Sequence, residues 1–171
     1  HPDVESPNLA LYDQILALEW IQKYVSFFGG DPSNVTLVGE SAGAGGISHL
    51  IASPLSKNLF HKAVHQSGGS SFTYPTSVSD VRKLANSFAN SFEDPSLKNL
   101  KNISAEEILE LSEEIYADHY FNYVDDGFSM IGNLSDTFKS GNVENVDLLI
   151  GSNNDEWSLY FDGNVDISLW P

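Results

Sequence analysis

The chain has 171 residues, of which 41% are apolar and 12% aromatic, so it can form a sizeable folded core and is not a disordered chain. Its 24 Asp and Glu residues against 8 Lys and Arg residues give a net charge of -16, which argues against nucleic acid and anionic membrane surfaces as partners. There is no cysteine, which excludes disulfides, thiolate metal sites and a cysteine nucleophile, and no run of 18 apolar residues that could span a membrane.

The first element predicted along the chain is a helix over residues 9–28, because apolar residues recur there at steps of three and four. These residues are Leu11, Ile15, Leu18, Ile21, Val25 and Phe28. Ser6 or Asn8 can cap the start of this helix, and the pair Gly29-Gly30 ends it.

Short apolar runs rich in β-branched residues predict the strands. Residues 35–38 are bounded by turn formers and predict a buried parallel strand, and a helix is expected over about 42–52. Residues 63–66 are a second strand candidate, and residues 147–151 return to strand character near the end of the chain.

The segment between these strands, about 76–120, is predicted to be a helical insertion. One apolar stripe consists of Val78, Val81, Leu84, Ala85, Phe88 and Phe92, and a second of Ile108, Leu111 and Ile115. Ser104 and Glu107 have the spacing of a capping box at the start of the second helix.

This alternation of strands and helices predicts the α/β class, with a mostly parallel sheet, helices on both of its faces and the inserted helical segment. Ligands of such folds bind beyond the carboxyl ends of the strands. The turns after residues 35–38 and 148–150 are therefore the places to search for a site.

The first of these turns contains the pentapeptide Gly39-Glu40-Ser41-Ala42-Gly43, a G-x-S-x-G motif between a predicted strand and a predicted helix. That context is the one required for a nucleophilic serine on a strained turn, where a Cβ at either glycine would collide with neighbouring backbone. The N–H of Ala42 and the N-terminus of the helix would face an oxyanion. A connection that merely turns a strand into a helix would explain the same five residues.

Residues 28–43 closely resemble the serine active-site signature of type B carboxylesterases, a family that includes the cholinesterases. The resemblance continues in order through residues 8–14, 66–68, 124–127 and 151–156. It implies a partial α/β-hydrolase fold and an enzyme that cleaves small-molecule carboxylic esters through an acyl-enzyme, with no metal and no organic cofactor.

The resemblance also implies roles for five residues. Ser41 would be the nucleophile, the Ala42 N–H an oxyanion donor and Glu156 the acid that orients a catalytic histidine. Glu40 resembles a buried carboxylate beside the nucleophile, and Ser67 matches a serine that holds the acidic side of the site by hydrogen bonds. Trp157 follows Glu156 where the family usually has glycine.

No histidine follows Glu156, although chain order in these hydrolases is serine, acid, histidine. The five histidines present, none of which is assigned a catalytic role, are His1, His49, His61, His65 and His119. The glycine-rich oxyanion loop is not found either. We therefore expect residues 1–171 to be the central part of one carboxylesterase domain, with its N- and C-terminal parts missing, and to be inactive alone.

Two alternatives stay open at this point. The chain could belong to a non-catalytic adhesion module with the same fold, although such relatives typically replace the serine that is present here as Ser41. Glu156 could be an ordinary solvated side chain in a polar turn. Residues placed near an acyl pocket by position alone are Phe72, Tyr74, Ala117, His119 and Tyr120.

Overall fold

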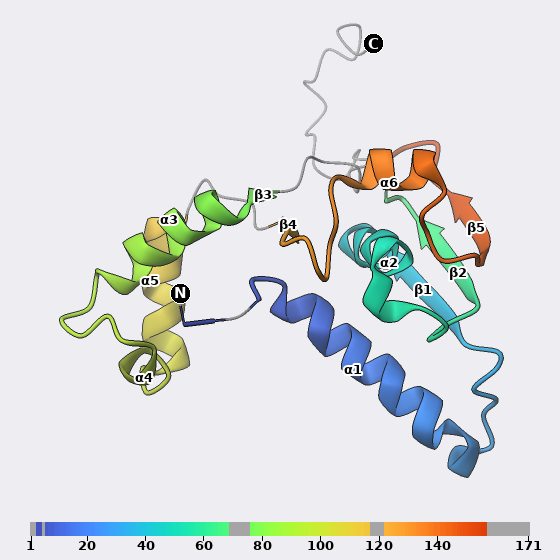
Figure 1. The fold of residues 1–171 in the computed structure, drawn as a ribbon, viewed down its shortest axis with the longest axis horizontal. Coiled ribbons are helices and arrows are strands. Elements are labelled where there is room, and N and C mark those ends of the chain that lie inside the picture. The colour runs from blue at the N-terminus through green and yellow to red at the C-terminus, as the bar shows by residue number, and fades with distance from the viewer. Residues whose placement is uncertain (1–2, 5, 69–75, 117–121, 157–171) are drawn as a thin grey trace, which may run out of the picture.

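A three-stranded parallel sheet lies at one end of the molecule (Figure 1). The structure is a computed structural model that describes residues 3–4, 6–68, 76–116 and 122–156. The strand order is β1-β2-β5, with bounds Thr36–Glu40, Lys62–Gln66 and Asp147–Gly151. In the register, Thr36 lies opposite Lys62 and Lys62 lies opposite Asp147. Because all the pairings are parallel, the carboxyl ends of the strands meet at one edge. The predicted α/β class and the three strands are confirmed.

The long helix predicted over residues 9–28 is confirmed, with a change of helix type near its end. The α-helix α1 covers Leu9–Tyr24 and continues as a 3₁₀ turn, Val25–Phe28. The turn ends at Gly29, whose φ of 82° is a conformation that glycine adopts at no steric cost.

Asn8 occupies the predicted N-cap position of α1, but its side chain does not cap the helix. Instead, the buried amide donates to the carbonyl of Val124 at 2.8 Å and accepts from the N–H of Val124 at 2.9 Å. It also donates to Ser129 Oγ at 2.8 Å. The amide therefore fixes a segment that lies more than a hundred residues away in the sequence.

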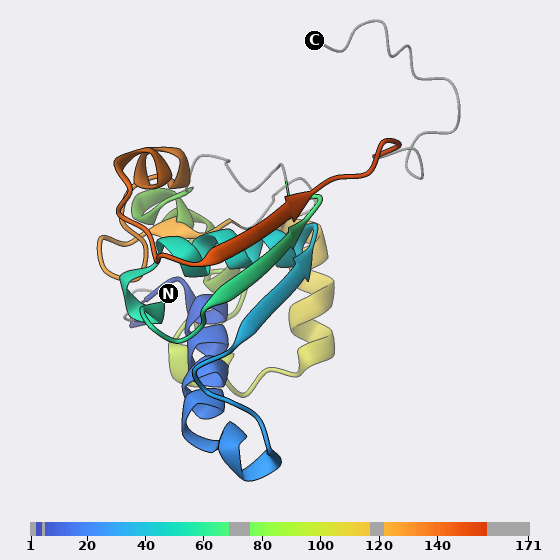
Figure 2. The same ribbon diagram turned by 90° about the vertical axis from the view of Figure 1, so that its right-hand side faces the viewer.

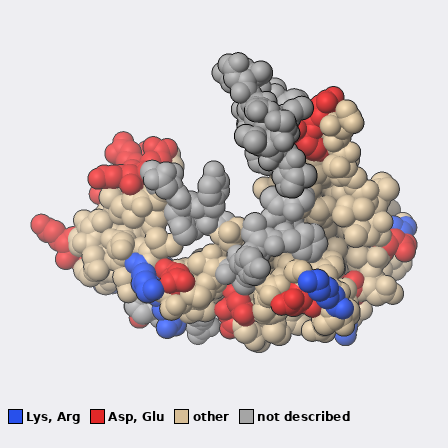
Figure 3. All heavy atoms as spheres, turned by 90° about the horizontal axis from the view of Figure 1, so that it is seen from above, with Lys and Arg blue, Asp and Glu red and all other residues tan. Residues whose placement is uncertain are grey.

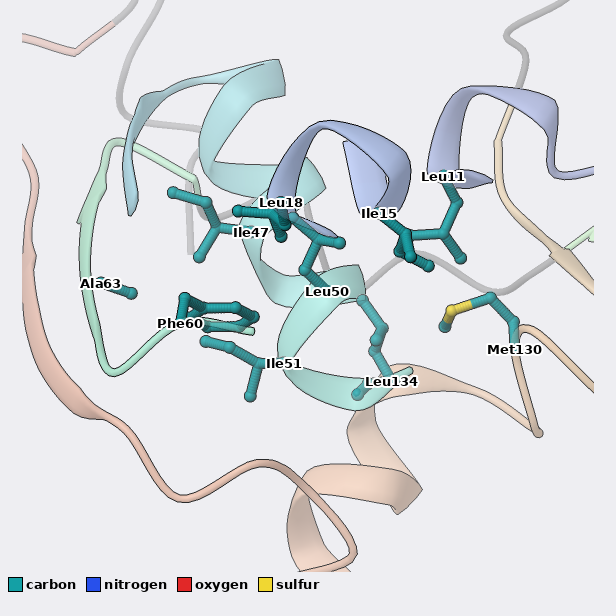
Figure 4. Close-up of a cluster of buried hydrophobic side chains, with 11 residues drawn as sticks. Leu11, Ile15, Leu18, Ile47, Leu50, Ile51, Phe60, Ala63, Met130 and Leu134 are labelled. Carbon is teal, nitrogen blue, oxygen red and sulfur yellow. The ribbon is translucent and has the colours of Figure 1, made fainter. Parts of the chain in front are cut away.

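The hydrophobic core lies between the sheet and the helices on one of its faces (Figure 4). Helix α2, Ala42–Ala52, has the predicted bounds and packs directly on β1 and β2. The buried side chains come from α1, α2, the loop before β2, β2 itself and the segment around α6 (Leu134–Ser140); they include Leu11, Ile15, Leu18, Ile47, Leu50, Ile51, Phe60, Ala63, Met130 and Leu134. Ser53 caps a short 3₁₀ turn, Pro54–Ser56, after α2.

The opposite face of the sheet is uncovered in the described part of the chain. Figure 2 shows the strands in front of α2. On this face Val38 and Leu149 are each 67% exposed. Within the described residues, α1, α2 and α6 all contribute to a core on the same side. Helices on the second face, and full burial of residues 35–38, are therefore not found in this part of the chain.

The segment expected to be helical forms a separate lobe (Figure 1). Its elements are β3 (Thr76–Ser77), α3 (Val78–Ala89), α4 (Leu97–Leu100) and α5 (Ala105–Ile115), and β3 pairs in parallel with β4 (Val124–Asp125). Ser104 Oγ accepts a hydrogen bond from the N–H of Glu107 at 3.1 Å, which confirms the Ser104 half of the predicted capping box.

Acidic side chains gather on this lobe in the space-filling view (Figure 3). The glutamates of α5 are all exposed: Glu106, Glu107, Glu110, Glu113 and Glu114. They therefore form the solvated face of an amphipathic helix, as the sequence indicates. Among the described residues, no helix combines the length and the hydropathy needed to cross a bilayer.

Candidate active site

Ser41 forms the turn between β1 and α2, where the sequence places the nucleophile. Its φ of 52° and ψ of -115° lie in a region that residues with a side chain rarely adopt. The turn is held by bonds on both sides: the N–H of Ser41 donates to Gln66 O at 2.9 Å, and the N–H of Gly45 donates to Ser41 O at 3.0 Å. Ser41 and Ala42 are both exposed, and the Ser41 side chain does not cap α2.

The close approach of α2 to β1 requires glycine at position 39. A Cβ on Gly39 would lie 2.5 Å from the carbonyl carbon and 2.6 Å from the carbonyl oxygen of Gly43. The second motif glycine differs, because a Cβ on Gly43 would meet nothing within 4 Å. The predicted steric requirement is therefore found at Gly39 and is wrong for Gly43 among the described residues.

Ser67 repeats the geometry of Ser41 one strand further along the sheet. Its φ is also 52°, and its N–H donates to Gly151 O on β5 at 2.8 Å, just as the N–H of Ser41 donates to Gln66 O on β2. Both serines thus follow the last residue of a strand, and both turns are fixed by a backbone bond to the next strand.

The Glu156 carboxylate is bound from two directions. Ser67 Oγ donates to Glu156 Oε1, and the backbone N–H of Asn153 donates to the same oxygen at 2.6 Å. The hydrogen bond from Ser67 lowers the pKa of Glu156 below its usual value, and the weaker effect of the bond from Asn153 acts in the same direction. The carboxylate is therefore anionic at neutral pH and oriented, although the side chain is exposed. The contribution of Asn153 is made by a backbone group, which leaves no side-chain pattern in the sequence.

Glu40 differs from its expected environment in the described part of the chain. It lies with Val38 on the uncovered face of β1 and is exposed, so these residues do not provide the burial expected for this carboxylate. A cavity of about 390 Å³ opens beside Glu40 and Ser67 and continues along the ends of β2 and β5.

The hydrogen-bond partners found for the described histidines are groups other than Ser41 and Glu156. His49 Nδ1 lies 2.7 Å from Gly45 O and its ring stacks on Tyr123, with 3.7 Å between the ring centroids. Burial lowers the pKa of His49. His61 Nδ1 accepts from Val35 N at 3.3 Å, and His65 Nε2 lies 3.0 Å from Ser48 Oγ.

Other residues named from the sequence lie outside the described ranges. These are His1, Phe72, Tyr74, Ala117, His119, Tyr120 and Trp157. Within the described ranges, no group of three or more histidines and carboxylates has the arrangement to hold a metal ion.

Comparisons with known proteins match this chain to carboxylesterases. The model of the carboxylesterase family matches residues 3–168. Carboxylesterase 5A of Homo sapiens is 37% identical over 156 residues, which cover 87% of this chain and 27% of the relative. Para-nitrobenzyl esterase of Bacillus subtilis (strain 168) is 32% identical over 170 residues, which cover 95% of this chain and 34% of the relative.

The fold leads to the same group of proteins. A solved structure of PNB esterase superposes with a TM-score of 0.80 at 31% sequence identity, covering 93% of this chain and 35% of that one. The chain thus spans between about a quarter and a third of the length of these three relatives.

Proposed function

Because the chain belongs to the carboxylesterase family, we propose that it carries the nucleophile and the acid of a serine esterase that acts on small-molecule carboxylic esters. The observation that carries the proposal is the shared edge of the sheet. Ser41 stands on a turn of positive φ after β1, and Glu156, which follows β5, is held there by Ser67, which follows β2. This arrangement of a serine turn and an oriented carboxylate at one edge supports the proposal in addition to family membership.

In the proposed reaction, Ser41 Oγ attacks the carbonyl carbon of the ester. A C–O bond forms, the π electrons move to the carbonyl oxygen, and the hydroxyl proton passes to a histidine supplied by a part of the protein beyond this chain. The backbone N–H of Ala42, at the positive end of α2, stabilises the oxyanion. The alcohol then leaves with that proton, and water releases the acid from the acyl-enzyme.

Glu156 acts in this scheme as the group that orients the histidine. Its hydrogen bonds from Ser67 and Asn153 keep the carboxylate ionised. Its remaining acceptor sites can then stabilise an imidazolium. A glutamine at position 156 would keep the shape but lose the charge.

We further propose that residues 1–171 are the central part of a larger esterase domain. Two features support this: the chain spans only part of the length of its relatives, and the exposed apolar residues Val38 and Leu149 leave one face of the sheet free to be covered by additional segments. The chain on its own would then lack the base and would be inactive.

The nucleophile is tested with a fluorophosphonate probe on the full-length protein, followed by mass spectrometry of the labelled peptide. We expect the label on Ser41 and none in the Ser41→Ala variant. Ser33→Ala, which removes an exposed hydroxyl that donates to Asp31 in a distant turn, serves as a matched control and should label normally. A folded protein that leaves Ser41 unlabelled would refute the esterase assignment.

The acid is tested with Glu156→Gln in the same protein. Loss of the charge that orients the base should lower kcat for a p-nitrophenyl ester by about 10³ to 10⁴. The isolated 171-residue chain should show no turnover above the imidazole background. Rapid turnover by that chain would contradict its proposed dependence on an outside histidine.

A further inference from the structure

His65 is a buried residue of β2, two positions before Ser67. It lies on β2 opposite Gly39 of β1 and is only 4% exposed. Its Nε2 lies 3.0 Å from Ser48 Oγ. Ser48 belongs to α2, the helix that begins directly after Ser41, so this bond connects β2 to the helix of the candidate nucleophile.

The same ring also determines where the Ser67 turn can lie. A Cβ on Gly68 would come within 2.1 Å of His65 Cε1 and 2.7 Å of the Cβ of Ala44 on α2. Gly68 therefore fits a slot between the imidazole and the helix, and only a residue without a side chain can enter it. A shift of the ring towards Gly68 would displace Gly68 and the adjacent Ser67.

The pairing of His65 with Gly39 explains how both contacts arise. Gly39 has no side chain, which lets α2 close onto β1. On the neighbouring strand, the ring of His65 fills the remaining space and reaches both Ser48 and Gly68. One side chain thus contacts the helix after the nucleophile and the turn that binds the acid.

Apolar packing alone does not account for an imidazole here. Its Nδ1 is buried and has no hydrogen-bond partner in the described part of the chain. A buried polar atom without a partner is unfavourable, and an apolar side chain of similar size would avoid that penalty. The directional bond to Ser48 is what an apolar residue could not supply.

We propose that His65 is a positioning residue of the esterase site, which sets the Ser67 turn, and through it Glu156, relative to α2. The inference rests on the proposed function. His65 acts without touching the substrate, by fixing the geometry between the nucleophile helix and the acid, where small displacements reduce the rate strongly.

The principal test is His65→Leu in the full-length protein, with His61→Leu as the matched control. His61 lies just before β2, and its Nδ1 accepts a bond from Val35, far from the carboxyl edge. We expect His65→Leu to lower kcat about 10- to 100-fold with KM changed less than about twofold and no fall in melting temperature. The control should keep its kcat.

Two further variants separate the hydrogen bond from packing. Ser48→Ala removes the partner of the imidazole and should lower kcat in the same direction. His65→Gln keeps a polar group that can hydrogen-bond to Ser48 and should restore part of the lost kcat. If His65→Leu melts earlier and its activity falls only with its folded fraction, the role is packing and the proposal is overturned.

A readout that does not depend on activity distinguishes this inference from the proposed function. The hydrogen bond from Ser67 lowers the pKa of Glu156, so a displaced Ser67 should let that pKa rise towards its usual value. NMR titration of the Glu156 carboxyl in His65→Leu measures this rise even in an inactive protein. An unchanged titration together with an unchanged kcat overturns the positioning role and leaves the esterase assignment standing. An unlabelled Ser41 overturns the esterase assignment, and the titration then still measures whether His65 sets the Ser67 turn.

Discussion

The two glycines of the G-x-S-x-G motif should respond differently to the addition of one methyl group. In Gly39→Ala, the new Cβ would lie 2.5 Å from the carbonyl carbon of Gly43 and 2.8 Å from the N of Ala44. Both are backbone atoms, which cannot rotate away, and ordinary van der Waals contact begins near 3.4 Å. Helix α2 must therefore move off β1. Overpacking of this kind lowers the free energy of unfolding by about 1–3 kcal/mol, and rigid contacts favour the upper end.

In Gly43→Ala, the new Cβ would meet nothing within 4 Å, and position 43 lies in the first turn of α2. Alanine is the better helix former, by up to about 1 kcal/mol, so this variant should be neutral or slightly stabilised. Urea denaturation of both variants measures the contrast. The rate of fluorophosphonate labelling provides a second measurement, which should fall in Gly39→Ala because its turn is displaced. Equal destabilisation by both substitutions, or none by Gly39→Ala, would refute the close-approach argument.

Three further predictions concern stability. Desolvation by burial raises the pKa of Asp126, but the carboxylate accepts hydrogen bonds from the N–H groups of Met130, Phe128 and Ser129 and from Ser129 Oγ. Together these bonds outweigh desolvation and lower the pKa to about 2. Its stabilising contribution is therefore present above pH 4 and lost between about pH 4 and 2. After discounting for solvent screening, this contribution to the unfolding free energy is roughly 1 kcal/mol. Between pH 4 and 2, the wild-type protein should therefore lose roughly 1 kcal/mol more unfolding free energy than Asp126→Asn loses. Phe60→Ala empties a site that is 1% exposed and should lower the unfolding free energy in urea by about 3–5 kcal/mol. Ser104→Ala removes the N-cap bond of α5 and should cost about 1 kcal/mol in the same assay, whereas Ser104→Asp should preserve stability.

Local sequence was sufficient for the elements that position the site. The bounds of α2 follow from a turn motif at its start and Ser53-Pro54 at its end, both of which act over a few residues. The strand at residues 147–151 was predicted because its apolar run is bounded by polar turns. Since parallel strands end at one edge, the neighbourhood of Ser41 and the Glu156 loop followed from topology alone.

Features that depend on distant neighbours were not predictable in this way. Asn8 has the sequence of a helix cap, yet the pairing it makes with Val124 depends on a segment that reaches it only in the folded state. The sequence predicts a buried Glu40, but burial requires segments that pack on its face of the sheet. The residues next to Glu40 in the sequence do not supply them. The close fit of Gly68 between His65 and Ala44 likewise depends on three elements that meet only in the folded chain: a strand, a helix and a turn.

The strand register has a consequence for how the protein is made. The pairing of Thr36 with Lys62 closes a loop of 26 residues, whereas the pairing of Lys62 with Asp147 closes one of 85. Short loops close first, and chain synthesis at about 5–20 residues per second delays the second pairing by about 4 to 17 s. During this interval β1, α2 and β2 can assemble the Ser41 turn, while the outer edge of β2 still has its hydrogen-bonding groups open. The nascent chain is therefore expected to need protection from aggregation at that edge until β5 emerges from the ribosome and closes it.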